Sequence, residues 1–219
     1  MVGILQEGSF KMKLARFAQA AVFALSLSIA SAALADAQGY IETQHSSMTS
    51  LLKQPTSSTR DAQISTLLDT MIDYDELVRR SFGEPCPAAL PSCTNHWKQL
   101  TDAQKTEMVG LIKKLVQKNY RKNLIKTLDF DVSYKGAKEQ SGEYRVKTEA
   151  KSKAKPRDPA VQIDYICKPS GNSYHVVDIV TEGSSLAKNY YDQFHKMLTT
   201  EGQGYSYIVT KVNSKINSI

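Results

Sequence analysis

The sequence lacks the motifs that mark most enzymes: it has no nucleophile elbow, no phosphate-binding loop and no paired metal-ligand motif. A nucleophilic triad would need one of its four histidines, His45, His96, His175 or His195, to be oriented by a carboxylate beside an exposed nucleophile, and no such arrangement is evident. Asp178 is the most suggestive acid, but within an apolar run it is better explained as a hydrogen-bonded buried group. We therefore expect no catalytic residues and no metal site.

Cysteine is scarce, with three in 219 residues, so the cysteines cannot all pair with one another. Cys86 and Cys93 enclose a short loop that contains prolines, and we expect them to form a local disulfide. Their spacing is not that of a usual zinc-ligand pair. Cys167 lies in an alternating apolar strand, which predicts a buried free thiol.

Charge is absent from a run that is rich in Ala, Leu and Ser, follows Lys11, Lys13 and Arg16, and ends at Ala35. This pattern predicts that residues 1–35 are a Sec-type signal peptide cleaved after Ala35, and that the protein is periplasmic. A membrane anchor is the alternative, although Ala and Ser dilute the run. No cysteine follows the small residues at its end, so a lipid-modified N-terminus is not expected.

Acidic residues are outnumbered, since the formal net charge is +6, and removal of residues 1–35 leaves +4. Basic residues gather in two segments, 113–126 and 147–157. Such runs are usually solvated faces. The functional alternative is attraction to an acidic partner or an anionic membrane surface, while export disfavours nucleic acid.

The remaining residues, 36–219, suit a single domain without internal repeats or long low-complexity segments. Its first half is helical: apolar residues recur at helical spacing in 41–52, 60–72 and 73–82. The clearest helix begins with a capping box at Thr101 and Gln104 and extends to about residue 124.

After Asp129 the apolar period changes from helical to two, which predicts strands at 130–134, 144–150, 161–167 and 174–181. Turns are expected at Lys135-Gly136 and at 169–172, and two helices follow at 185–198 and 205–216. The pattern predicts an α+β fold in which an antiparallel sheet of about four strands packs against several helices. Such a layout can enclose a pocket for a small apolar ligand.

The stretch Tyr174–Leu186 resembles the strand, Glu-Gly turn and helix of MlaC-type periplasmic phospholipid-binding proteins, also called the toluene-tolerance family. Residues 73–77 and 97–101 resemble the N-terminal half of that family, and the resemblance covers most of 41–215. The Cys86–Cys93 loop is a departure, because the family passes almost directly from helix end to the following aromatic residue.

The resemblance implies a fold related to the NTF2-like cone, with an interior that takes the acyl chains of a glycerophospholipid. It also implies a monomeric, non-catalytic carrier without a cofactor. The family works between an outer-membrane lipoprotein-porin complex and an inner-membrane ABC transporter with an MCE-domain subunit, and so maintains outer-membrane lipid asymmetry.

On that basis the lipid-binding wall is expected on one sheet face and the helices above it, at Leu111, Leu115, Val146, Thr148, Val161, Ile163, Tyr165, Val177, Ile179, Leu186, Tyr190 and Phe194. Each of these residues could equally be ordinary core. If the assignment of a strand is wrong by one residue, the opposite face, with Tyr174, Val176 and Val180, lines the pocket instead. Lys147 and Lys188 are candidate neighbours of the phosphate.

Two other functions remain open at the level of sequence. A small exported enzyme of NTF2-like architecture would need an acid-base pair inside the cavity, and the apolar parity of the strands argues against it. An adaptor with a filled core could instead bind another envelope protein through its basic helix.

Overall fold

The computed structural model describes residues 37–86 and 92–219, except for the side chains of 120–125. The predicted signal peptide, residues 1–35, lies outside the described residues. The helices are 37–52, α2 (Ser58–Met71), α3 (Tyr74–Ser81), the 3-10 helix η1 (Trp97–Gln99), α4 (Asp102–Thr127), α5 (Leu186–Thr199) and α6 (Tyr205–Ser218). The strands are β1 (Phe130–Gln140), β2 (Glu143–Ser152), β3 (Val161–Ser170), β4 (Ser173–Thr181) and β5 (Ser184–Ser185). None of the described helices is long and apolar enough to cross a membrane.

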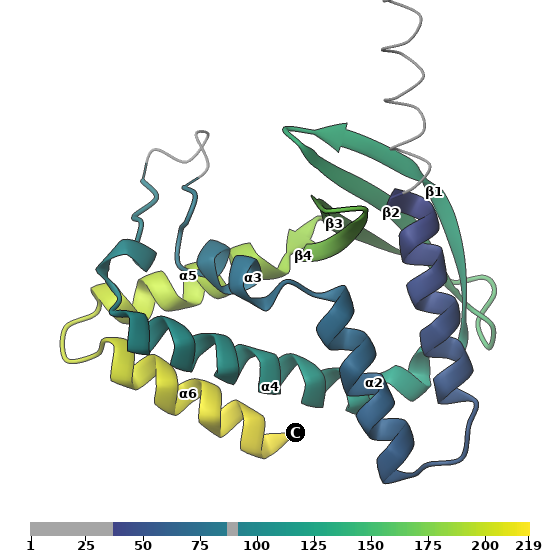
Figure 1. Ribbon diagram of the computed structural model, residues 1–219, viewed down its shortest axis with the longest axis horizontal. Helices are drawn as coiled ribbons and strands as arrows, with labels where there is room; N and C mark the ends of the chain where they lie inside the picture. Colours follow the sequence, from purple (N-terminus) through teal and green to yellow (C-terminus); the bar gives the residue numbers. More distant parts are fainter. Residues whose placement is uncertain (1–36, 87–91) are drawn as a thin grey trace, which may run out of the picture.

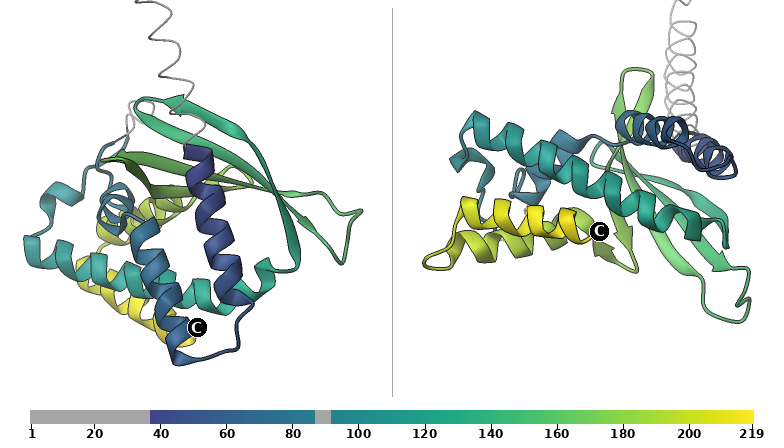
Figure 2. Two further views of the ribbon diagram at one scale, coloured as in Figure 1. Left: turned by 45° about the vertical axis from the view of Figure 1, so that its right-hand side comes forward. Right: turned by 90° about the horizontal axis from the view of Figure 1, so that it is seen from below.

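The five strands form one antiparallel sheet in the order of the sequence, β1-β2-β3-β4-β5. Helix 37–52 lies across one face of this sheet, while α4 and α6 run side by side away from it (Figures 1 and 2). The predicted α+β fold is therefore confirmed, with β5 as a short additional strand.

The helix starts follow from local hydrogen bonds that the sequence specifies. At α4 the hydroxyl of Thr101 accepts from the backbone N–H of Gln104 at 3.3 Å, and the Gln104 side chain accepts from the N–H of Thr101 at 2.9 Å. At α3 the carboxylate of Asp73 accepts from the N–H of Glu76 at 2.9 Å. Each cap satisfies donors that the first helical turn would otherwise leave unpaired.

The turn predicted at Lys135-Gly136 is wrong, because β1 continues to Gln140. The pairing with β2 shifts between Tyr134 and Ala137, and Gly136 has a φ of 101°. A glycine inside a strand often marks a bulge of this kind rather than its end. The chain turns instead at Ser141-Gly142, where φ is 55° and 80°.

The apolar core has two parts. One cluster joins helix 37–52 and α2 to the sheet and includes the fully buried Ile41 and Val146. The other lies among α3, α4, α5 and α6 and includes the fully buried Phe82 and Ile112. The sheet therefore belongs mainly to the first cluster, and the helical layer to the second.

Backbone contacts join the helical layer to the sheet where α2 ends. Ile72 forms an isolated parallel bridge with Val176 of β4, and the N–H of Asp73 donates to the carbonyl of Val176 at 3.0 Å. This junction fixes the start of α3 against β4.

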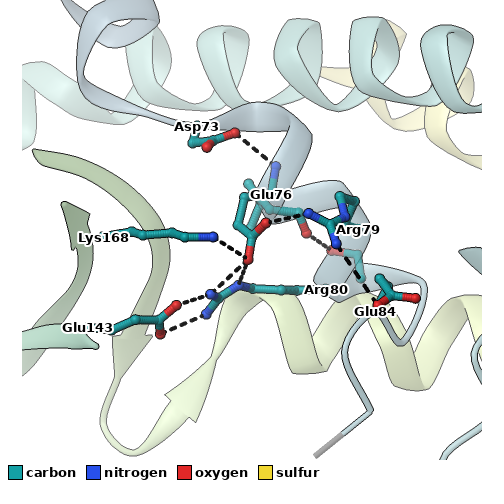
Figure 3. A network of polar contacts seen from close by, with 9 residues as sticks. Asp73, Glu76, Arg79, Arg80, Glu84, Glu143 and Lys168 are labelled. Atoms are coloured by element: carbon teal, nitrogen blue, oxygen red, sulfur yellow. Dashed lines mark hydrogen bonds and ion pairs between the residues drawn. The ribbon is translucent and has the colours of Figure 1, made fainter. Parts of the chain in front are cut away.

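A network of ion pairs strengthens the same junction (Figure 3). The buried carboxylate of Glu76 on α3 lies 3.0 Å from Arg79, 3.0 Å from Arg80 and 3.6 Å from Lys168 of β3. Arg80 also binds both carboxylate oxygens of Glu143, at the start of β2. The guanidinium of Arg80 thus links α3 to the β1–β2 hairpin.

Cys86 and Cys93 form a disulfide with a Cα–Cα distance of 5.7 Å. Residues 87–91 between them lie outside the described residues. Cys167 is a buried free thiol on β3, and burial raises its pKa to about 12. It therefore stays protonated and packs as a small apolar side chain.

Candidate functional site

A cavity of about 700 Å³ lies between helix 37–52 and the sheet face formed by β1, β2 and β3. Its volume falls within the range of about 300–1,000 Å³ that is typical of small-molecule sites. Its apolar lining consists of Met48, Leu128, Phe130, Val132, Ala150, Val161 and Ile163. Val132 is 41% exposed, the only large apolar side chain in the described ranges that is exposed. Apolar surface is thus available to a ligand here.

Six of the residues predicted for the lipid-binding wall share the sheet face that bears the cavity. Val161, Ile163 and Tyr165 of β3 line it directly. The other three, Val146, Thr148 and Ile179, lie opposite Tyr165 or Ile163 in the neighbouring strands. Val146 and Thr148 are fully buried, so they support the wall from within the core.

A β-bulge moves Val177 out of the predicted alternation. Ile166 of β3 pairs with Asp178, but the next residue, Cys167, pairs with Val176, so Val177 faces no residue of β3. Val176 instead belongs to the apolar cluster beneath helix 37–52. The parity rule failed locally because a bulge inserts one residue into one strand only.

The remaining five predicted wall residues belong to the cluster among α3, α4, α5 and α6: Leu111, Leu115, Leu186, Tyr190 and Phe194. None of them lines the cavity. Helical spacing identified their apolar faces correctly, but α4, α5 and α6 cover those faces by packing against one another. Periodicity shows that a face is apolar without showing what covers it.

Sequence reasoning missed the contributions of helix 37–52 and β1. His45, within the predicted helix 41–52, received no binding role from the sequence, whereas its ring lies in the cavity wall between two tyrosines. Nδ1 is 2.8 Å from the hydroxyl oxygen of Tyr134 on β1, and Nε2 is 3.0 Å from that of Tyr165 on β3. The alternation of Phe130, Val132 and Tyr134 in the sequence was the available signal for the β1 wall.

Burial lowers the pKa of His45 to about 4, so the ring is neutral near pH 7. A neutral imidazole carries one N–H donor and one bare acceptor nitrogen. One tyrosine hydroxyl therefore accepts from the ring while the other donates to it. Burial, followed by the charge of Glu42, raises the pKa of Tyr134 to about 12, which keeps that hydroxyl protonated. His45 thus joins helix 37–52 to β1 and β3 through hydrogen bonds.

Acidic pH is expected to weaken the hydrogen bonds of His45 with these two tyrosines. Since the pKa of His45 is lower in the folded protein than the ordinary 6.5, the unfolded chain binds more protons between pH 6.5 and about 4. The free energy of unfolding should fall as pH decreases through that window, with a slope approaching about 1.4 kcal/mol per pH unit. Urea denaturation of the wild type and His45→Gln at pH 7, 5.5 and 4.5 measures it.

Gln is a suitable replacement because it keeps one donor and one acceptor but does not titrate. His96 and His195, whose Nε2 and Nδ1 atoms lie 2.8 Å apart, are present in both proteins. The difference between the two pH profiles therefore isolates the contribution of His45. His175→Gln serves as a control and should follow the wild type. Parallel pH profiles for the wild type and His45→Gln would contradict the assignment.

Lysines from three segments also line the cavity: Lys53, Lys126 and Lys153. The lysines suggested by the sequence lie elsewhere. Lys188 pairs with Asp192 at 2.6 Å on α5, and the exposed Lys147 is not among the lining residues.

A second cavity of about 400 Å³ lies beside the disulfide and the start of α5. Its charged groups are engaged in structural contacts: Arg80 with Glu143, and Asp178 with the N–H groups of Ile179 at 2.8 Å and Ala187 at 3.0 Å. Asp178 is thus the hydrogen-bonded buried group that its sequence context predicted. The smaller cavity offers less apolar lining to a ligand.

Metal-ligating side chains do not gather in the described part of the chain: no three of His, Cys, Asp or Glu come close enough to hold an ion.

Comparison with known proteins identifies related sequences and structures. The family model described as MlaC protein matches residues 42–214. The solved structure of a phospholipid-binding protein from Ralstonia solanacearum, in complex with a phospholipid, aligns with a TM-score of 0.63 and 19% sequence identity. The alignment covers 84% of this chain and 98% of that one, and at this identity it shows a shared fold. No curated protein matches the sequence.

Proposed function

The chain belongs to the MlaC family, and from that premise we propose that it binds a glycerophospholipid, with the acyl chains in the cavity beneath helix 37–52. The observation that carries this proposal is the open apolar lining of that cavity, including the exposed Val132 on the edge strand. The structural relative from Ralstonia solanacearum, which was solved with a phospholipid, supports it.

The energetics of acyl chains explain why a carrier needs such a wall. Two chains hold roughly 30 methylenes, and each is worth about 0.8 kcal/mol when removed from water. Transfer through an aqueous space without cover would therefore cost on the order of 20 kcal/mol. Apolar side chains from a helix and three strands can replace the membrane interior for at least part of this surface.

We further propose that the protein is exported and works as a soluble, non-catalytic carrier in the periplasm. In this scheme a signal peptide of residues 1–35 directs export, and the mature chain is a single domain. The carrier moves phospholipid between an outer-membrane lipoprotein-porin complex and an inner-membrane ABC transporter with an MCE-domain subunit, and so maintains outer-membrane lipid asymmetry. Membership of the MlaC family supports this scheme.

Native mass spectrometry of the protein from the periplasmic fraction of a Gram-negative host tests the proposal. We expect the mass of residues 36–219 plus that of one phospholipid, identified by lipid extraction from the same sample. A folded protein that carries no lipid would favour the adaptor function instead. A mass that includes residues 1–35 would contradict the proposed cleavage.

A further inference from the structure

Three lysines gather at one end of the cavity although they come from distant segments. Lys53 follows the last turn of helix 37–52, Lys126 lies in the last turn of α4, and Lys153 follows β2. The C-terminal ends of the two helices lie side by side with the start of β1 (Figures 1 and 2). Lys153 is held there because its ammonium donates to the carbonyl of Leu128 at 2.8 Å.

The positive charge at this end is only partly compensated. Lys153 lies 3.5 Å from the largely exposed carboxylate of Asp131, a weak surface pair. Within the described residues, the ammonium groups of Lys53 and Lys126 have neither an ion-pair nor a hydrogen-bond partner. Glu42, the other acid that lines the cavity, lies about 16 Å from Lys53 along the helix.

Helix dipoles account for part of this arrangement. Lys53 and Lys126 both lie at helix C-termini, where a cation offsets the partial negative charge of unpaired carbonyl groups. That role, however, requires no common orientation, whereas these side chains line the same cavity from different elements. Their neighbours in that lining include the apolar Leu128 and Phe130. This end therefore suits an amphiphile with an anionic group beside an apolar chain.

We propose that Lys53, Lys126 and Lys153 bind the phosphate of the glycerophospholipid, an inference that rests on the proposed function. Lysine ammonium groups bind phosphate as point charges and tolerate variation in its substituents. The lipid would then lie with its headgroup at the C-terminal end of helix 37–52. Its acyl chains would extend over Val132 and Ile163 toward His45.

The test compares two ligands with the same acyl chains, phosphatidylglycerol and diacylglycerol, which lacks the phosphate. Delipidated protein is equilibrated with mixed micelles of both ligands, and the bound ligands are extracted and quantified. The site variant carries Lys53→Gln, Lys126→Gln and Lys153→Gln. The control variant carries Lys98→Gln, Lys138→Gln and Lys147→Gln, which remove the same charge from exposed positions outside the cavity.

We expect the ratio of bound phosphatidylglycerol to bound diacylglycerol to be about tenfold lower in the site variant than in the wild type, with diacylglycerol binding unchanged. The control variant should keep the wild-type preference, and added salt should reduce that preference in the wild type. Equal preference in the wild type and the site variant would overturn the proposal, as would equal loss of both ligands.

A third arm distinguishes lipid phosphate from free phosphate. Inorganic phosphate is titrated into delipidated wild-type protein, and binding is followed by calorimetry. Phosphate binding without any lipid preference would assign the lysines to a free anion and overturn the proposal. If the delipidated wild type takes up neither lipid, the proposed function fails. Uptake of both lipids without preference overturns the phosphate site alone.

Discussion

Replacement of Ile163 by Trp is expected to remove most phospholipid from the cavity while the protein stays folded. Ile163 is partly buried on β3 and lines the cavity between helix 37–52 and the sheet. A larger side chain there extends into open space, unlike an insertion into a filled core. If it displaces three or four methylenes of an acyl chain, binding weakens by about 3 kcal/mol, roughly a hundredfold in affinity.

Lipid extraction gives the lipid content per folded molecule, and thermal melting of the same sample gives the stability, so loss of lipid and loss of stability are measured separately. Ile166→Trp is the matched control, because it makes the same change three residues later on the other face of β3, opposite Arg145 and Asp178. The control should retain lipid. Unchanged lipid content in Ile163→Trp, together with a strongly lowered melting temperature, would show that Ile163 is plain core and would contradict the proposed site.

Replacement of Glu76 by Ala is expected to lower the free energy of unfolding by about 2 kcal/mol. The Glu76 carboxylate is only 7% exposed and lies 3.0 Å from the guanidinium of Arg80, whose side chain is 20% exposed. Its loss leaves Arg80 with Glu143 as its one remaining carboxylate partner and removes the contact between α3 and Lys168 of β3 (Figure 3). Arg79 and Lys168 are more exposed and should contribute little.

Urea denaturation followed by circular dichroism measures this loss. Asp75→Asn is the control: it removes a carboxylate from the same helical turn, but Asp75 is exposed, so a change within about 0.5 kcal/mol is expected. A Glu76→Ala protein as stable as this control would show that desolvation of the ion pair cancels its attraction.

The Glu76 network also has a pH dependence. Burial acts to raise the pKa of Glu76, but the hydrogen bond from Arg80 and the charges of Arg80, Lys168 and Arg79 outweigh it, so the pKa lies below the ordinary 4.5. The unfolded chain therefore takes up a proton first as pH falls. The stabilisation is complete above the ordinary pKa and is lost as pH falls through the lower folded value.

The sequence by itself determined the elements whose signals are local. The capping box at Thr101 and Gln104 began α4 as predicted, because its donors and acceptors lie three residues apart. Alternation located the main strands, since each pleat places successive side chains on opposite faces. Cys86 and Cys93 lie close together in the sequence, and they form a disulfide.

Only the tertiary structure decided which apolar faces line the cavity and which are filled core. The two tyrosines that flank His45 are 89 and 120 residues away in sequence, beyond the reach of any local pattern. Phe194 and Ile163 both carried an apolar signal, but one packs among helices and the other faces the cavity. Periodicity records the preference of a side chain for burial, whereas the neighbour that buries it is chosen by packing between distant segments.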